Sequence, residues 1–335
     1  MPAVKLTDVA QAAGVSLATA SRVLNGSHRS PAEDISQRVR AAAEELGYVA
    51  NAQAQALARS ATGLIGMVVH NIADPYFSSI VSGAQRVARE SGSQVLLAGT
   101  DRNERAELSA VRAFAAYRTD AIILAGSRGY HDDVALTEAL RRYVANGGRV
   151  VTFGRSAFSQ ARIVEISNRD GARELAAALV ERGIRRFAVL GGPELLVTPR
   201  DRVAGYRDAL TAAGLQPLAV VSGEFTSQGG YTSALACWDR LAPADREGLC
   251  ILAVNDLMAL GAITAMRSLG QRVPDDVRVA GFDDIPTLRD YAPSLTTFRL
   301  PLQEMGERAA ELALAREWSE PVQIRGEVMV RESAH

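Results

Sequence analysis

Short apolar runs recur along most of the chain and alternate with amphipathic segments. The first four begin 31, 26 and 29 residues apart, at 64–69, 95–98, 121–125 and 150–153. Five more follow, at 163–166, 187–190, 218–221, 250–254 and 277–280. Continuous apolar runs are typical of buried parallel strands, and amphipathic segments between them are typical of βαβ units. The pattern therefore predicts an α/β fold with doubly wound parallel sheets.

The segments between the runs have the spacing of helices that cover such sheets. Residues 170–182 place Ala172, Leu175 and Leu179 on one stripe, and Gly183 suits the left-handed end of a helix. Crossovers of this kind cover both faces of a parallel sheet. Nine strands are too many for one modest sheet beside a ligand crevice, and they divide near residue 161. We therefore expect two similar lobes with a cleft between them.

Residues 1–50 have a different pattern, with three short helical segments. Val9, Ala10 and Ala13 form the buried side of the first segment, which Gly14 ends. Ser16 is placed to cap the second segment, and the third runs from about 32 to 46 before Gly47. Two short helices joined by a glycine turn are typical of a helix-turn-helix domain. We expect a small three-helix bundle that is separate from the lobes.

The second of these helices presents small, polar and arginine side chains outward. In the major groove of DNA, Arg22 could bind a guanine edge, and Leu17 or Ala18 could contact thymine methyl groups. Four further side chains suit phosphate oxygens, namely Ser16, Thr19, Ser21 and Asn25. Any three-helix bundle exposes such residues, and residues 1–60 carry only six basic against five acidic side chains. The pattern alone therefore leaves DNA binding open.

Composition and charge narrow the classes of protein. Hydrophobic residues make up 47% and charged residues 22%, which is typical of a globular protein and excludes wholesale disorder. The net charge of −1 excludes a global basic field, so any DNA contact must be local. The start of the chain has no signal-like region, and no apolar run reaches about 18 residues. We expect a cytoplasmic protein that neither enters a membrane nor is exported.

Candidate catalytic chemistry is sparse. The chain has no Gly-x-Gly-x-x-Gly, phosphate-loop, Gly-x-Ser-x-Gly or His-Glu-x-x-His motif. The four histidines are far apart in sequence: His28, His70, His131 and His335. Cys237 and Cys250 lie in apolar surroundings, which predicts two buried thiols and no disulfide framework. We expect no enzymatic activity, no cofactor and no metal site. A freestanding small-molecule-binding protein is an alternative, because the two lobes alone would fit it.

Polar residues follow several of the predicted strands. Asn255 and Asp256 come after the run 250–254, Asp283 and Asp284 come after the strand that begins at 277, and Arg155 follows 150–153. Open parallel sheets bind ligands beyond the carboxyl ends of their strands. Carboxylate, amide and guanidinium groups can each bridge adjacent hydroxyls. The sequence therefore predicts a cleft that binds a small, sugar-like molecule.

Several longer motifs resemble those of the lactose/galactose-repressor (LacI/GalR) family of bacterial transcription regulators. They are spread over nearly the whole chain: TDVAQAAGVSLATASRVLNG at 7–26, ELGYVAN at 45–51, DPYF at 74–77, DRVAGY at 201–206, NDLMALGA at 255–262, GFDD at 281–284 and LTT at 295–297. The resemblance implies a helix-turn-helix DNA-binding domain at 1–50, a linker or hinge helix at 51–61, and an effector-binding and dimerisation core at 62–335. The core would be periplasmic-binding-protein-like, with lobe 1 at about 62–161 and 295–320 and lobe 2 at about 162–290 and 322–335.

The resemblance also implies roles for individual residues. On the DNA-binding side it adds Tyr48, Asn51 and Leu57, the last as a wedge that enters the minor groove from a linker that folds only on the operator. A flexible linker whose Leu57 packs on its own protein is the alternative. In the cleft it implies Tyr76 and Phe77 from lobe 1, with Thr198, Arg202, Phe225, Asn255 and Asp283 from lobe 2. Some of these could instead cap loops or fill the core.

The function implied is a homodimeric repressor of carbohydrate-utilisation genes, bound to a pseudo-palindromic operator and released by a sugar-like effector. A corepressor-dependent repressor with a purine-type effector is the alternative within the family. Two departures leave the effector open, because Ser167-Asn168 stands where many members have Asp-Asn, and 195–197 is unusually apolar. The chain lacks a heptad tail after residue 331, so we expect dimers and no helical tetramer.

Overall fold

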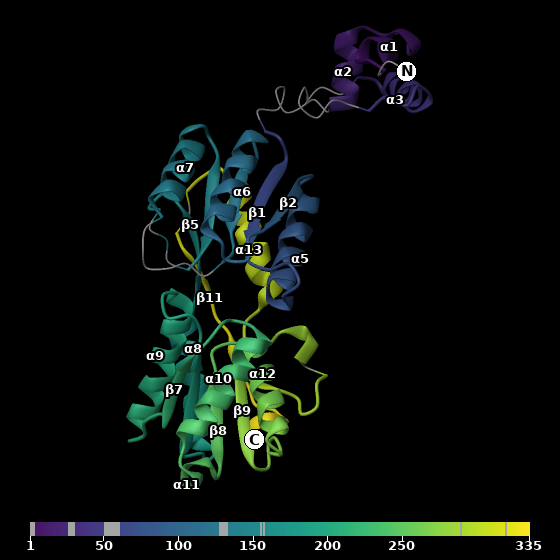
Figure 1. The fold of residues 1–335 in the computed structure, drawn as a ribbon. Helices are drawn as coiled ribbons and strands as arrows, with labels where there is room; N and C mark the ends of the chain where they lie inside the picture. Colours follow the sequence, from purple (N-terminus) through teal and green to yellow (C-terminus); the bar gives the residue numbers. More distant parts are fainter. Residues whose placement is uncertain are drawn as a thin grey trace. The chain divides into compact units, whose positions relative to one another are not determined.

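A computed structural model gives the fold of the chain. It describes residues 4–25, 31–49, 61–126, 133–154, 156, 158–288, 290–318 and 320–335. The chain divides into two compact units, Met1–Gly63 and Leu64–His335 (Figure 1). The residues expected to form the linker, 51–61, lie outside the described ranges except for Ala61.

The N-terminal unit is a three-helix bundle, as the sequence predicted. Its helices are α1 (Leu6–Ala12), α2 (Leu17–Asn25) and α3 (Glu33–Glu45). Gly14 takes a φ of +63° in the turn between α1 and α2, a conformation that glycine adopts without strain. Ser16 caps α2, because its Oγ accepts a hydrogen bond from the Thr19 amide at 3.1 Å. The bundle closes over a small core: Val9, Ala10, Ala13, Ala20, Val39, Ala42 and Ala43.

Lobe 1 of the second unit contains a six-stranded parallel sheet in the order β11-β5-β4-β3-β1-β2. Its strands are β1 (Leu64–Val69), β2 (Gln94–Gly99), β3 (Ala121–Leu124), β4 (Arg149–Phe153), β5 (Arg162–Ile166) and β11 (Val322–Ile324). The helices α5 (Pro75–Glu90) and α13 (Leu302–Leu314) pack together on one face, and α6 (Glu104–Ala116) and α7 (Val134–Ala145) cover the other. Strand β3 shows the two faces, because Ile123 joins the core under α5 whereas Ile122 joins Phe114 of α6.

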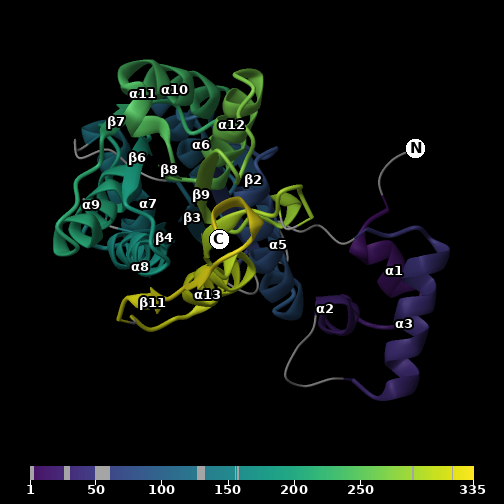
Figure 2. The same cartoon turned by 90° about the horizontal axis from the view of Figure 1, so that it is seen from below.

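Lobe 2 repeats this plan with the order β12-β10-β9-β8-β6-β7. Its strands are β6 (Arg186–Gly191), β7 (Ala219–Ser222), β8 (Leu249–Ala253), β9 (Val277–Asp283), β10 (Thr296–Arg299) and β12 (Glu327–Met329). Only β12 runs antiparallel to its neighbour. The helices are α8 (Asn168–Glu181), α9 (Val197–Ala212), α10 (Ser227–Arg240), α11 (Pro243–Arg246) and α12 (Asp256–Ser268), with 3-10 turns at Pro286–Leu288 and Glu332–Ala334. Helix α8 pairs with α9 and α10 with α12, with the sheet between the two pairs (Figure 2).

Three strands lie in a different lobe from the one that the sequence predicted. Strand β5 pairs with β4 and β11, so lobe 1 extends beyond residue 161 to Ile166. Strand β10 pairs with β9 in lobe 2, although 295–320 was assigned to lobe 1. Strand β11 lies in lobe 1, although 322–335 was assigned to lobe 2. The boundaries were wrong because hydrophobic runs locate strands but do not identify their pairing partners.

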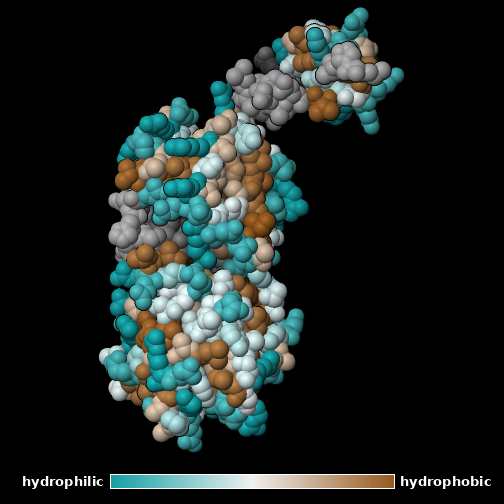
Figure 3. Space-filling view, in the orientation of Figure 1, coloured by the Kyte–Doolittle hydropathy of each residue, from teal (hydrophilic) through white to brown (hydrophobic). Residues whose placement is uncertain are grey.

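The second unit exposes hydrophobic residues on one face and buries its two thiols. On the face drawn in Figure 3, hydrophobic residues gather over β1 and β2, and Leu97 of the edge strand β2 is 42% exposed. Cys237 and Cys250 are buried, and burial raises their pKa values to about 11 and about 12, so both thiols are weak nucleophiles. Within the described ranges, every helix is too short or too polar to span a bilayer.

The loop between β2 and α6 is held by a helix cap that we expect to contribute measurably to stability. Asn103 precedes α6, and its Oδ1 accepts a hydrogen bond from the Ala106 amide at 3.0 Å. Replacing Asn103 with alanine should lower the free energy of unfolding by about 1 kcal/mol, because the amide loses its partner. Urea unfolding measures the change. Asn103→Asp restores a good cap and should stay close to wild type, and equal losses in both variants would contradict the cap.

Candidate functional site

A pocket lies between the two lobes of the second unit, at the ends of several strands. The space between its walls, counted together with the open solvent at its mouth, is about 580 Å³. Lobe 1 and the end of β5 contribute His70, Asp74, Tyr76, Phe77, Arg102, Ala125, Gly126, Phe153, Gly154 and Ile166. Lobe 2 contributes Asn168, Thr198, Arg202, Phe225, Asn255 and Asp283. The pocket therefore lies where two parallel sheets present the carboxyl ends of their strands.

Arg202 of α9 organises the lobe 2 wall. Its Nε donates to Asn168 Oδ1 at 2.9 Å, and its Nη1 donates to the Val254 carbonyl at 2.7 Å. Its Nη2 lies 2.9 Å from Asp283 Oδ1. The guanidinium carbon is 3.9 Å from the centroid of the Phe282 ring. Because protein groups engage all three nitrogens and one face of the planar guanidinium, Arg202 is held in a fixed position in the pocket wall.

Asp283 ends β9 with a φ of +118° and is buried beside Arg202. Burial raises the pKa of this carboxyl above its ordinary value, and the neighbouring Arg202 charge opposes that shift. A non-glycine residue with such a φ is rare and persists only where its surroundings hold it. The pair therefore places one buried acceptor and its counter-ion at the edge of the cleft.

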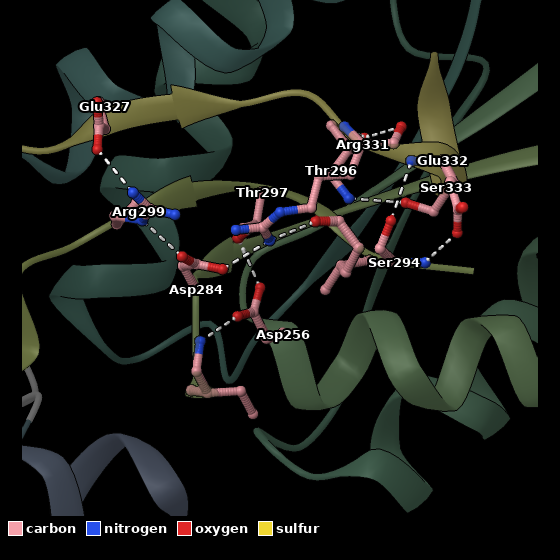
Figure 4. Close-up of polar contacts among 12 residues, drawn as sticks. Asp256, Asp284, Ser294, Thr296, Thr297, Arg299, Glu327, Arg331, Glu332 and Ser333 are labelled. Atoms are coloured by element: carbon pink, nitrogen blue, oxygen red, sulfur yellow. Dashed lines mark hydrogen bonds and ion pairs between the residues drawn. The ribbon is translucent and has the colours of Figure 1, made fainter. Parts of the chain in front are cut away.

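Asp256 braces the turn that follows Asp283 (Figure 4). Its Oδ2 accepts from the Ile285 amide at 2.8 Å, and its Oδ1 accepts from Thr297 Oγ1 at 2.7 Å. Burial, reinforced by the charge of Asp283, raises the pKa of Asp256 well above its ordinary value. Asp256 does not line the pocket, so its part is to hold β9, β10 and the intervening loop in register.

Aromatic rings and one acidic side chain form much of the lobe 1 wall. The Tyr76 and Phe77 rings meet edge to face with centroids 5.0 Å apart, and Phe77 meets His70 in the same way at 5.6 Å. Asp74 caps α5 by accepting from the Tyr76 amide at 2.9 Å, and burial raises the pKa of Asp74. Burial and the Asp283 charge also raise the pKa of Tyr76. Tyr76 and Asp283 both line the pocket, so polar groups of the two lobes meet there.

Arg102 reaches from lobe 1 toward lobe 2. Its guanidinium carbon lies 5.2 Å from the centroid of the Phe225 ring, within the range of a cation–π contact. Its backbone is left-handed, with a φ of +60°, and burial lowers the pKa of its side chain. Its buried Nε has no hydrogen-bond partner in the structure. A ligand with an acceptor atom could satisfy that donor.

The structure brings together most of the residues expected in the cleft. Seven line this one pocket: Tyr76, Phe77, Thr198, Arg202, Phe225, Asn255 and Asp283. Arg155 lies outside the described residues. Asn255 also caps α12 through the Met258 amide at 2.9 Å, and Phe225 belongs to the hydrophobic core, so both have structural parts as well. Their roles toward a ligand stay a prediction.

Sequence reasoning missed four polar residues of the pocket: His70, Asp74, Arg102 and Asn168. His70 directly follows β1, and Arg102 lies three residues after β2. The strand-end rule that selected Asn255 and Asp283 could therefore have found His70 and Arg102. Within the described residues, no cluster of three or more His, Cys, Asp or Glu side chains could hold a metal ion.

The helix α2 presents much of the surface expected to contact DNA. Ser16, Leu17, Ala18 and Arg22 are exposed, Leu17 at 49%, while Thr19 and Ser21 are half-buried. Ala20 faces the bundle core. Tyr48 is half-buried and packs against the same core, which gives it a structural part that the sequence did not indicate. The side chain of Asn25, and Asn51 and Leu57 altogether, lie outside the described residues.

Comparisons with known proteins agree with this two-unit design. Residues 5–51 match the model of the bacterial regulatory proteins of the lacI family, and residues 176–334 match a periplasmic binding protein-like domain. The HTH-type transcriptional regulator CelR of Thermobifida fusca is 35% identical over 97% of this chain and 96% of its own length.

Two solved structures extend the likeness to the whole fold. A CelR–cellobiose complex superposes with a TM-score of 0.71 at 32% identity, covering 98% of this chain and 99% of that one. A lac repressor dimer bound to operator and the anti-inducer ONPF superposes with a TM-score of 0.84 at 28% identity, covering 99% of both chains. The chain therefore belongs to the lacI family of bacterial regulatory proteins and is a DNA-binding transcriptional regulator.

Proposed function

We propose that this regulator is a repressor of carbohydrate-utilisation genes that a small sugar-like effector releases from its operator. The observation that carries the proposal is the pocket between the lobes, where guanidinium, carboxylate and amide groups converge beside aromatic rings. Polar groups of these types bind hydroxyls, and aromatic faces cover apolar C–H surface. The solved complex of CelR with cellobiose supports the same class of ligand.

The charges of the pocket favour an uncharged ligand. Asp74 and Asp283 supply two carboxylates, and Arg102 and Arg202 supply two guanidinium groups. Asp283 and Arg202 are paired at 2.9 Å, while Arg102 carries the Nε donor that lacks a partner. A neutral polyhydroxylated molecule can accept from Arg102 without adding a buried charge that would need its own counter-ion. This balance favours a sugar over a sugar phosphate or an organic acid.

On DNA, we infer a homodimer whose two α2 helices enter successive major grooves, roughly 34–36 Å apart, on a pseudo-palindromic operator. The dimeric state of the operator-bound lac repressor supports this assembly. The edge strand β2, with exposed Leu97 beside half-buried Val95 and Leu96, offers a face for the second copy. Such a regulator works in the bacterial cytoplasm, where its operator lies.

The effector would act by changing the arrangement of the two lobes, from which the linker at 51–61 leads to the DNA-binding unit. A ligand drives this change only if its affinity differs between the two arrangements. Coupling of about 1–3 kcal/mol changes operator affinity roughly 5–150-fold. Leu57 stays the predicted minor-groove wedge of the linker, outside the described residues.

Selection of bound sequences from a random duplex pool, followed by gel shifts with a panel of small molecules, tests the proposal. We expect one preferred palindromic sequence, and we expect cellobiose or another sugar to weaken binding to it by about fivefold or more. The same sugar should raise the melting temperature of the protein by mass action. A nucleobase that strengthens binding would instead establish a corepressor. Sugar binding without preference for any duplex would contradict a regulator.

A further inference from the structure

Three segments cross between the lobes, and they run side by side. The first joins β5 to α8 through Ser167, the second joins β10 to α13 through Leu300 and Pro301, and the third joins β11 to β12 through Arg325 and Gly326. We call these the crossover segments. Any change in the angle between the lobes must pass through them, because they are the chain connections between the two sheets in the described residues.

Backbone contacts tie the three crossover segments into one unit. The Ser167 amide and hydroxyl both donate to the Ile324 carbonyl, at 3.3 and 3.1 Å, which joins the first segment to the third. A Cβ on Gly326 would collide with the Arg299 carbonyl oxygen, so the third segment packs directly on the second.

One arginine joins the lobe 2 ends of the second and third crossover segments (Figure 4). Arg299, the last residue of β10, places its Nε 2.6 Å from Asp284 Oδ2. Its Nη1 lies 2.9 Å from Glu327 Oε1, at the start of β12. Asp284 is 1% exposed and also receives Arg331 Nη1 at 2.7 Å on its other oxygen. All of these contacts lie within lobe 2, but Arg331 follows β12 and contacts only Asp284 and the Leu295 carbonyl, so it does not join the two crossover segments.

The same segments adjoin the pocket at two points. Asp283, which pairs with Arg202, immediately precedes Asp284. Asn168, which accepts from Arg202 Nε, immediately follows Ser167. Asp283 and Asp284 both have left-handed backbones, with φ of +118° and +56°. Their side chains diverge, one toward the pocket and the other toward Arg299, so a movement of Asp283 must displace Asp284 through a strained, stiff turn.

We propose that Asp284, Arg299 and Glu327 form a crossover clamp. The clamp sets the arrangement of the two lobes, and it changes that arrangement when Asp283 moves in the pocket. The inference rests on the proposed function, since it explains how occupancy of the pocket changes the lobes. None of the three residues lines the pocket. They are therefore positioning residues, which act through Asp283 and the crossover segments and not by contact with the effector.

Distances between spin labels on the two lobes test the clamp without any ligand or operator. Labels at Tyr117→Cys in lobe 1 and Leu218→Cys in lobe 2 use exposed positions, and the native thiols are buried. In the full-length protein, Arg299→Gln should broaden the distance distribution, with a roughly fivefold rise in the rarer lobe arrangement, the change that about 1 kcal/mol produces. Because the readout needs neither sugar nor DNA, it can fail or succeed independently of the proposed function.

Arg331→Gln is the matched control. This substitution also removes one positively charged partner of Asp284, but it leaves the contact between Arg299 and Glu327 in place. The distances between the spin labels should therefore match those of the wild type. Equal changes in Arg299→Gln and Arg331→Gln, or no change in either, would contradict the clamp. Glu327→Gln removes only the ion pair between Arg299 and Glu327. The Glu327 side chain is 64% exposed, so this variant should fold normally. It should shift the distribution in the same direction by less, and an unchanged distribution would count against the clamp even if Arg299→Gln failed to fold.

A double-mutant cycle tests the link to the pocket. Asp283→Asn should alter the lobe distances in the otherwise wild-type chain, and the alteration should largely disappear on the Arg299→Gln background. Additive effects of the two substitutions, or no effect of Asp283→Asn, would show that the clamp does not carry information from the pocket.

Discussion

Replacing Asp283 with asparagine is expected to abolish the effector response while operator binding persists. Asp283 is the buried carboxylate that lies 2.9 Å from Arg202, and asparagine keeps its shape but not its charge. The variant loses an acceptor for ligand hydroxyls and leaves Arg202 without its counter-ion. Breaking a buried pair on one side costs about 3–5 kcal/mol, so the free energy of unfolding should fall as well. Effector titrations of the operator complex and urea unfolding measure the two effects.

A double variant separates the two parts of this prediction. Arg202→Met with Asp283→Leu removes both charges, and well-packed apolar replacements of a buried ion pair are often neutral or stabilising. Asn168 and the Val254 carbonyl lose their Arg202 donor in this variant, so we expect it to be more stable than Asp283→Asn but less stable than wild type, while its effector response stays absent. A normal dose curve in Asp283→Asn would remove Asp283 from the binding site. Recovery of the response in the double variant would show that the pair serves stability alone.

Helices and strands could be predicted from the sequence where the residues of a single element form a recognisable pattern. Continuous apolar runs located the strands from β1 to β9, and the glycine turn with the Ser16 cap located α1 and α2. Strands β11 and β12 have only three residues each, too few for a hydrophobic period. Their lobes depend on which strands they pair with: β11 pairs with β5 across more than a hundred residues, whereas β12 pairs with β10, and both pairings are tertiary.

The pocket residues likewise divide into those that a local sequence pattern identifies and those whose contacts depend on the tertiary structure. Arg202 and Asp283 could be selected because they stand in family motifs, and Asp283 also because it ends a strand. Arg102 is close enough to the end of β2 for the strand-end rule to select it, but the place of its guanidinium over Phe225 depends on how closely the two lobes approach. Arg299 and Glu327 are 28 residues apart on segments that meet only in the folded core. Nothing in the local pattern of residues indicates that contact.

In the DNA-binding unit, we expect Arg22→Gln to weaken binding to the preferred operator by about 1–3 kcal/mol, roughly 5–150-fold, because a bidentate arginine–guanine contact is lost. Arg22 is exposed in the last turn of α2, where its charge adds at most a few tenths of a kcal/mol to the helix, so the bundle should stay folded. Gel shifts with the operator and with a random duplex of equal length measure the loss.

The comparison between the two duplexes decides what Arg22 does. A contact with a base edge contributes only on the correct sequence, so Arg22→Gln should narrow the gap between operator and random DNA. Arg40→Gln makes the same charge change on the exposed surface of α3 and should leave that gap unchanged, since any phosphate contact there is independent of sequence. If Arg22→Gln instead lowered both affinities equally, and high salt removed the difference from wild type, Arg22 would be a phosphate contact. Sequence recognition by α2 would then depend on its exposed small residues, Leu17 and Ala18.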